Sequence, residues 1–203
     1  IPSIPKYHWK REPVDTRDHI YNPLALGSVP ATLPSSIDLR NYCSAIEDQG
    51  GLGSCTSHAI AALIEYLDRK SGKNLDVSRL FIYYEERVIE GSVNYDAGAY
   101  IRDGIKVVNK KGAPLENLWP YIETKYRSRP SSASYADALK RKAGAYQKCT
   151  DFTAVKQALA QGYPVAVGFD VYESFETATV AMTGVMPYPN VNTEQLLGGH
   201  AVA

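Results

Sequence analysis

Two short motifs, far apart in the chain, carry residue types that are suited to acyl transfer. Residues 48–55 read Asp-Gln-Gly-Gly-Leu-Gly-Ser-Cys, and residues 198–202 read Gly-Gly-His-Ala-Val. The helical spacing after Cys55 places this thiol at a helix N-terminus, where free amide protons and the helix dipole favour the thiolate. The side-chain amide of Gln49 and the backbone N–H of Cys55 can point at one oxygen, as in an oxyanion hole. Glycines such as Gly53 let the backbone approach a substrate closely.

A cysteine nucleophile needs a basic partner, and the chain offers four histidines. His58 lies one turn along the same predicted helix, where we expect a packing or lining residue. His8 and His19 belong to an irregular N-terminal segment and are poor candidates. His200 opens an apolar strand, so a rigid element can aim it, and it is selected by elimination. The alternative for Cys55 is a small buried residue in a glycine-rich loop.

The composition is typical of a globular chain. Of the 203 residues, 44% are hydrophobic and 22% are charged. Twenty-two basic residues balance twenty-two acidic ones, so we expect neither nucleic acid nor an anionic membrane as a partner. No apolar run is long enough to cross a bilayer. The sequence begins with Ile1 rather than Met, which is compatible with an upstream signal peptide and a secreted or cell-envelope protein, so the compartment stays open.

The order of the predicted elements is helices first and strands second. Apolar periodicity and capping residues predict helices over residues 55–70, 78–91, 97–112 and 151–162. Strands are predicted at residues 164–169, at 184–186 and from 200 onward. This order indicates an α+β fold with segregated lobes. We expect an N-terminal extension at 1–33, a mainly helical lobe at 34–120 and a β-rich lobe at 121–203.

Five segments together resemble the papain-like cysteine peptidases. They occur in that family's order and read Leu33–Arg40, Glu47–Cys55, Trp119-Pro120-Tyr121, Pro164–Val167 and Gly199–Val202. The resemblance covers about residues 33–203 and is greatest to the compact bacterial members. It implies a two-lobed α+β fold, with a helical left lobe, a β-rich right lobe and the active-site cleft between them.

The resemblance also implies roles for individual residues. Cys55 would be the nucleophile that forms a thioester, and His200 would share its proton and later protonate the leaving amine. Gln49 would supply an amide to the oxyanion hole. The substrate backbone would be bound at Ala97-Gly98, with Gly53 and Gly199 nearby. Tyr100 would lie near an apolar specificity pocket, or else pack under the third helix.

The chain departs from the family pattern at several points. Thr56 follows the nucleophile where the family usually has an aromatic residue, and Leu52 replaces a cysteine, so one family disulfide is absent. For Cys43 and Cys149 we favour two free thiols over a bridge. The long helical pro-segment is missing from residues 1–33. The asparagine that orients the family's histidine is also missing, and we expect it beyond Ala203.

These features predict a cysteine endopeptidase that acts on peptide or protein substrates as a monomer, without a metal or other cofactor. Two alternatives stay open: an acyltransferase that passes the thioester to an amine, and an inactive binding module with the same fold. The N-terminal extension contains apolar residues such as Tyr7 and Trp9, which are unusual in a solvated tail. We therefore expect it to fold back over the cleft and restrain activity, the alternative being a disordered tail.

Overall fold

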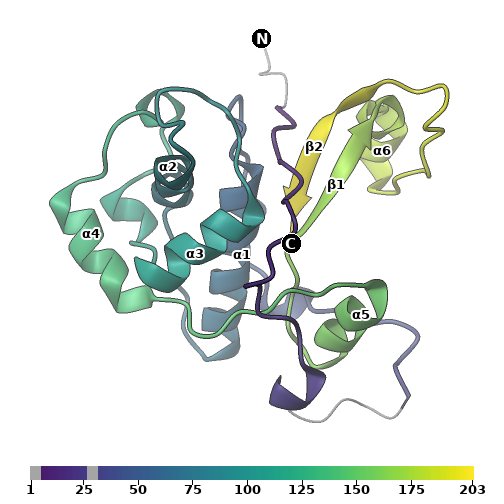
Figure 1. Ribbon diagram of the computed structural model, residues 1–203, viewed down its shortest axis with the longest axis horizontal. Coiled ribbons are helices and arrows are strands. Elements are labelled where there is room, and N and C mark those ends of the chain that lie inside the picture. Colours follow the sequence, from purple (N-terminus) through teal and green to yellow (C-terminus); the bar gives the residue numbers. More distant parts are fainter. Residues whose placement is uncertain (1–5, 27–31) are drawn as a thin grey trace.

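The structure is a computed structural model that describes residues 6–26 and 32–203, and these form two lobes (Figure 1). The helical lobe contains α1 (Cys55–Lys70), α2 (Arg79–Glu90), α3 (Ile101–Lys110) and α4 (Ser132–Ala138). The second lobe contains α5 (Phe152–Ala160), β1 (Val167–Tyr172), α6 (Ala178–Thr183) and β2 (Leu196–Val202). In the part of the chain described, no helix is long and apolar enough to cross a membrane.

Capping residues set the helix boundaries that the sequence predicted. Ser78 accepts a hydrogen bond from the backbone N–H of Phe81 and begins α2, and Gly91, with a φ of 69°, ends it. Asp151 accepts a hydrogen bond from the N–H of Ala154 at 2.8 Å and begins α5. The helices predicted at 55–70, 78–91 and 151–162 are confirmed. The third begins at Ile101, several residues later than predicted.

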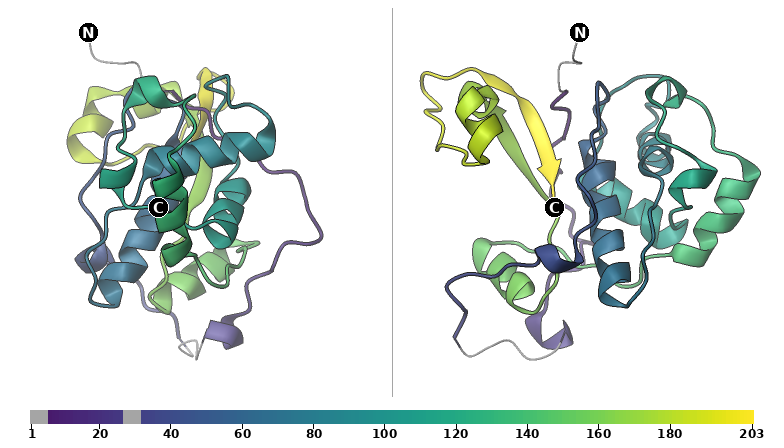
Figure 2. Two further views of the ribbon diagram at one scale, coloured as in Figure 1. Left: turned by 90° about the vertical axis from the view of Figure 1, so that its left-hand side faces the viewer. Right: turned by 180° about the vertical axis from the view of Figure 1, so that it is seen from behind.

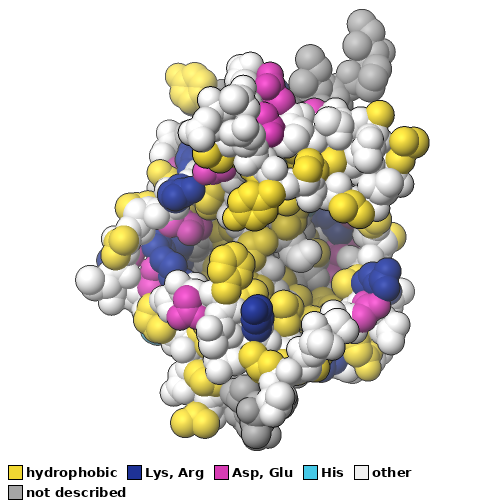
Figure 3. All heavy atoms as spheres, turned by 90° about the vertical axis from the view of Figure 1, so that its right-hand side faces the viewer, with side chains coloured by type: hydrophobic (Ala, Val, Ile, Leu, Met, Phe, Trp, Pro, Cys, Tyr) yellow, Lys and Arg dark blue, Asp and Glu magenta, His cyan; other side chains and the backbone are white. Residues whose placement is uncertain are grey.

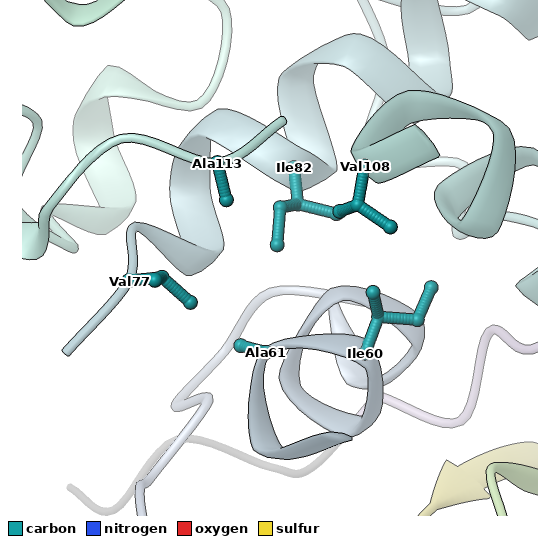
Figure 4. Close-up of a cluster of buried hydrophobic side chains, with 6 residues drawn as sticks. All are labelled: Ile60, Ala61, Val77, Ile82, Val108 and Ala113. Carbon is teal, nitrogen blue, oxygen red and sulfur yellow. The ribbon is translucent and has the colours of Figure 1, made fainter. Parts of the chain in front are cut away.

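The core of the helical lobe lies between α1, α2 and α3. Its six apolar residues are fully or almost fully buried and pack face to face (Figure 4): Ile60, Ala61, Val77, Ile82, Val108 and Ala113. A second cluster joins α4 to this lobe through Ala138, Phe81 and Val107. The helical lobe therefore extends past residue 120, where the sequence had placed its end.

Buried charged groups on α2 tie the helices to the surrounding loops. Arg79 donates to both carboxylate oxygens of Glu65 at 3.1 Å, and Glu65 also accepts the N–H of Val77 at 3.0 Å. Arg87 is fully buried and donates to the carbonyls of Tyr83 and Val93, among others. Buried charges are tolerated only when they are paired or hydrogen-bonded in this way, so Arg79 ties α2 to α1 and Arg87 ties α2 to the loop that contains Val93.

The second lobe has one antiparallel pair of strands in the described residues, β1 with β2. Phe169 lies opposite His200, and Gly168 lies opposite Ala201. The strand predicted at Pro164 begins only at Val167, and it is partly exposed rather than buried. The strand predicted at residues 184–186 is wrong, because Gly184 instead ends α6 with a φ of 68°.

The described part of the N-terminal extension, which we call the arm (residues 6–26), runs between the two lobes (Figures 1 and 2). His8 forms a parallel bridge with Gly199 on β2, and Ile20 forms one with Lys148. Arg102 on α3 holds the middle of the arm through Asp18 at 2.8 Å and the carbonyl of Pro13 at 2.9 Å. The arm therefore contacts both lobes along its length.

Glu86 on α2 is fully buried, and it gives a first testable prediction. Its Oε2 accepts a hydrogen bond from Thr56 Oγ1 at 2.9 Å, and burial raises the pKa of this carboxyl well above its ordinary value. Because this pKa is higher in the folded state than in the unfolded chain, protonation of Glu86 stabilises the fold at acid pH. This contribution to the free energy of unfolding is lost as the pH rises towards the folded-state pKa. Glu86→Gln keeps the shape and the acceptor without the charge.

We expect the free energy of unfolding of Glu86→Gln, minus that of wild type, to increase between about pH 5 and about pH 8, because only wild type loses stability over this range. Urea unfolding at both values measures this difference. Glu176→Gln, at an exposed carboxyl, is the matched control and should show no such trend. A difference between wild type and Glu86→Gln that is constant with pH would contradict the prediction.

Candidate active site

Cys55 is the first residue of α1, and its side chain faces the second lobe. It is only 1% exposed and forms a buried cluster with Ala59 and with Ala201 of β2. Ala201 directly follows His200, so the fold brings together the ends of the two motifs that the sequence singled out. The helix N-terminus and the strand meet across the boundary between the lobes.

Burial decides the protonation state of Cys55 in this structure. Loss of solvent raises the pKa of the thiol, and the nearby Glu86 acts in the same direction. Hydrogen bonds from the backbone of Ala201, Thr56 and His8 act to lower the pKa but do not overcome burial. With the arm in place, Cys55 is therefore a neutral thiol at neutral pH.

His200 lies in an aromatic cage. Its ring packs edge-on against Tyr7 of the arm at 5.5 Å and against Phe169 of β1 at 5.9 Å, and Phe175 lies 6.4 Å away. Burial lowers the pKa of the imidazole. Its Nδ1 is buried, with no hydrogen-bond partner among residues 6–26 and 32–203. A neutral ring therefore accompanies the neutral thiol, and no ion pair is formed while the arm is seated.

Gln49 lies on the loop before α1, which polar contacts hold in place. Its Nε2 donates to the carbonyl of Leu52 at 2.8 Å and to the arm carbonyl of Lys6 at 3.3 Å. Tyr121 donates to the carbonyl of Gln49 at 2.8 Å, and its hydroxyl lies 2.6 Å from Ser54 Oγ. The amide that the sequence assigned to an oxyanion hole is thus directed at a peptide carbonyl of the arm.

The other predicted binding residues surround the same part of the arm. Gly98 has a φ of +67°, and a Cβ there would lie 1.8 Å from the carbonyl oxygen of His8, so only glycine fits. Gly53 and Gly199 touch His8 and Trp9 in the same way. Ala97 is half-buried beside Gly98. Tyr100 precedes α3, and the ammonium of Lys10 lies 5.4 Å from its ring.

The arm pairs its backbone with both walls of the cleft. Trp9 N–H donates to the carbonyl of Gly199 at 2.8 Å, and Gly199 N–H donates to the carbonyl of Tyr7 at 3.2 Å. On the other wall, Lys10 N–H donates to the carbonyl of Ala99 at 3.2 Å. The cleft therefore binds an extended peptide segment through main-chain hydrogen bonds, as an added strand would be bound.

Two ion pairs flank the segment of the arm that lies in the cleft. Lys6 pairs with Asp96 at 2.7 Å, and Lys10 pairs with Glu90 at 2.6 Å. Both carboxylates are largely buried, with side-chain exposures of 10% and 7%. Asp96 also accepts the N–H of Gly53 at 3.0 Å, so one carboxylate holds the glycine loop and the arm together.

His58 has the packing role that the sequence assigned to it. Its Nδ1 lies 3.0 Å from the carbonyl of Ser54, its ring packs edge-on against Tyr121, and burial lowers its pKa to about 4. The sequence reasoning did not identify Phe169 or Phe175 as neighbours of His200. Phe169 could have been found from the pairing of two strands, whereas nothing in the sequence indicated Phe175.

The remaining reactive groups are few. Cys43, Cys55 and Cys149 are all free thiols, as the sequence favoured. Within residues 6–26 and 32–203, no group of three or more His, Cys, Asp or Glu side chains is arranged to hold a metal ion.

The chain is similar in sequence and in fold to known cysteine proteases. Residues 33–203 match the family described as papain family cysteine protease. The structure superposes on xylellain, a cysteine protease from Xylella fastidiosa, with a TM-score of 0.84 and 36% identity, over 99% of this chain and 79% of that one.

Two curated sequences are also similar to the chain. An uncharacterised peptidase C1-like protein of Acanthamoeba polyphaga mimivirus is 42% identical over 190 residues, 85% of this chain and 60% of that protein. Cathepsin K of Gallus gallus is 28% identical over 178 residues, 82% of this chain and 50% of that protein. The chain thus spans between half and three fifths of the length of these relatives. From its matching residues and its fold, the chain belongs to the papain family of cysteine proteases.

Proposed function

We propose that the chain acts as a cysteine endopeptidase through Cys55, His200 and Gln49. The observation that carries this proposal is the meeting of the α1 N-terminus with β2, which brings Cys55 against the residue that follows His200. A helix N-terminus favours the thiolate once water and substrate replace the arm. An imidazole on a strand from the opposite lobe is suited to accept the thiol proton.

The reaction proceeds in two steps, formation of a thioester at Cys55 and its hydrolysis. The sulfur of Cys55 attacks the carbonyl carbon of the scissile peptide, His200 takes the thiol proton, and the imidazolium then protonates the leaving amine as the C–N bond breaks. Water attacks the resulting thioester with His200 as base, which releases the acid and restores the thiol. Gln49 Nε2 and the N–H of Cys55 donate to the oxyanion in both steps.

The walls that hold the arm also serve as the substrate-binding surface. Ala97, Gly98 and Tyr100 belong to one wall, Gly199 to the other, and Gly53 lies beside the nucleophile. An extended peptide that used the backbone groups of Ala99 and Gly199 would be bound by the hydrogen bonds that now hold the arm.

The N-terminal extension, residues 1–33, restrains this activity. Its described part fills the cleft, directs a carbonyl at Gln49 and shields both Cys55 and His200 from water. Activity then requires the arm to move out or to be cut. The two ion pairs and the Trp9 contacts oppose that movement, so the enzyme is largely latent while they persist.

The first test is the nucleophile itself. Cys55→Ala should lower hydrolysis of a fluorogenic peptide by about a thousandfold or more, because no other group forms the thioester. A thiol-directed epoxide should label Cys55 in the wild type, as peptide mapping would show. Cys43→Ala, at an exposed thiol, is the matched control and should retain full activity. Hydrolysis that persists in Cys55→Ala would exclude the proposed mechanism.

The second test concerns the arm. Trp9→Ala removes an apolar contact with the cleft wall. The free energy gained by burying a side chain of this size is enough to shift the fraction of molecules whose arm occupies the cleft by about tenfold or more. We expect turnover of a short peptide to rise by that factor. Tyr188→Ala, at a fully exposed aromatic residue, controls for the loss of a ring. Unchanged kinetics in Trp9→Ala would show that the arm does not restrain the site.

The third test follows the pKa of the thiol. Because burial raises it, the thiolate of wild type appears only at high pH. Release of the arm readmits water, so the midpoint of Cys55 alkylation by iodoacetamide should move to lower pH in Trp9→Ala. The rate at Cys43 in the same sample serves as an internal standard. A midpoint that stays fixed or moves upward would contradict the link between the arm and the thiol.

A further inference from the structure

Two carboxylates on the helical side of the cleft each bind an ammonium group of the arm. Asp96 lies in the loop between α2 and α3 and receives the ammonium of Lys6 at 2.7 Å. Glu90 is the last residue of α2 and receives that of Lys10 at 2.6 Å. On the face that carries β1, β2 and α5, by contrast, hydrophobic side chains surround a hollow (Figure 3). Both lysines of the arm are therefore bound by the helical lobe.

The two oxygens of Asp96 have different partners. Oδ1 accepts the N–H of Gly53 at 3.0 Å and the hydroxyl of Tyr83 at 2.5 Å, whereas Oδ2 accepts the ammonium of Lys6. Burial acts to raise the pKa of this carboxyl, but the hydrogen bonds from Lys6, Tyr83 and Gly53 outweigh it, and the pKa is lowered. Because the bonds from Gly53 and Tyr83 do not involve the arm, they hold the carboxylate in place when the arm leaves. Oδ2 then remains to accept another cation.

Glu90 is arranged in the same way. Oε1 accepts the backbone N–H of Tyr100 at 2.9 Å, and Oε2 accepts the ammonium of Lys10. The same ammonium lies 5.4 Å from the centre of the Tyr100 ring, within the range of a cation–π contact. The helix dipole opposes an acidic residue at the C-terminal end of a helix, and burial removes the side chain from water. A bound cation offsets both of these unfavourable effects.

The spacing of the two lysines matches an extended peptide. The stretch between them bonds to both walls of the cleft through its main chain. Side chains alternate between the two sides of an extended chain, so residues four apart point to the same side, with Cα atoms about 13 Å apart. This geometry is the same in whichever direction the chain runs. A peptide with basic side chains four residues apart can therefore reach both carboxylates.

We propose that Asp96 and Glu90 determine which substrates the cleft accepts, by binding two basic side chains, lysine or arginine, that are four residues apart in an extended peptide. The inference rests on the endopeptidase activity proposed above and adds the charge pattern of its substrates. The arm occupies the two cation sites with its own lysines, so the sites are open only in molecules whose arm has moved.

The test uses peptides in competition, with the full chain. Each peptide has one donor–quencher pair and neutral side chains, except for two lysines four residues apart, and these lysines are moved along the peptide one residue at a time. In the comparison peptides norleucine replaces either lysine, which keeps most of the apolar stem without the charge. The product ratio gives the ratio of kcat/KM values, which does not depend on the fraction of molecules whose arm is displaced.

Wild type should cleave one register of the lysine pair best. Replacing either lysine in that register by norleucine should lower kcat/KM about tenfold, as expected for a hydrogen bond to a largely buried charge. Peptides whose lysines are three or five residues apart should lose the preference for one of them, because the two side chains then point to opposite sides of the chain.

Two variants should separate the sites. Glu90→Gln and Asp96→Asn each keep an oxygen for the bonds within the wall and remove the charge. Glu90→Gln should abolish the preference for one lysine and keep that for the other, and Asp96→Asn should do the reverse. Asp170→Asn is the matched control, since it removes an exposed carboxylate that pairs with Arg11 at 3.0 Å. An ion pair this exposed contributes little, so both preferences should stay within about twofold of wild type.

A binding measurement keeps the sites testable apart from catalysis. The same peptides, labelled with fluorescein, are titrated onto Cys55→Ala, and the ratio of Kd values for the lysine and norleucine peptides is again independent of the arm. Equal values for both kinds of peptide, or an equal loss of both preferences in all three variants, would overturn the cation sites while the peptidase stands. If neither wild type nor Trp9→Ala cleaves any peptide, the endopeptidase proposal fails, and the titration alone decides whether the two sites bind cations.

Discussion

The contact between the N-terminal end of α1 and strand β2 is the constraint on which the site depends. It buries Cys55 against Ala59 and Ala201 and joins a helical lobe to a strand of the other lobe. The buried Arg79–Glu65 pair holds α2 against α1, so the helix end is fixed from behind. Because the two elements come from different lobes, whatever lies between them controls access to the thiol.

The same contact sets the electrostatic surroundings of the two reactive groups. A helix N-terminus lowers the pKa of a cysteine only when the thiolate can be solvated or paired. Here the arm excludes water, burial raises the pKa of Cys55 and lowers that of His200, and both groups are neutral. Main-chain hydrogen bonds hold the arm by means that suit any extended peptide, so under the proposed function restraint and substrate binding would share one surface.

Much of the helical lobe could be predicted because local signals determine it. Ser78, Gly91 and Asp151 mark helix ends through bonds to their own neighbours. The glycine loop before Cys55 could also be predicted, because its signal lies in consecutive residues. The strands were placed less well, since β1 is partly exposed and its pairing with β2 is a long-range contact. Thr56, a departure from the family pattern, has its partner in Glu86, thirty residues away, and no local pattern shows that.

The apolar residues of the N-terminal extension led us to predict that it lies over the cleft, whereas the register of the arm on Gly199 and Ala99 depends on the assembled lobes. Amide hydrogen exchange tests that register most directly. The backbone N–H groups of Trp9, Lys10 and Gly199 should be protected together in the free protein and should lose protection together once a bulky peptidyl epoxide occupies Cys55. Rapid exchange at Trp9 and Lys10 in the unmodified protein, or protection that survives the modification, would contradict an arm seated over the nucleophile.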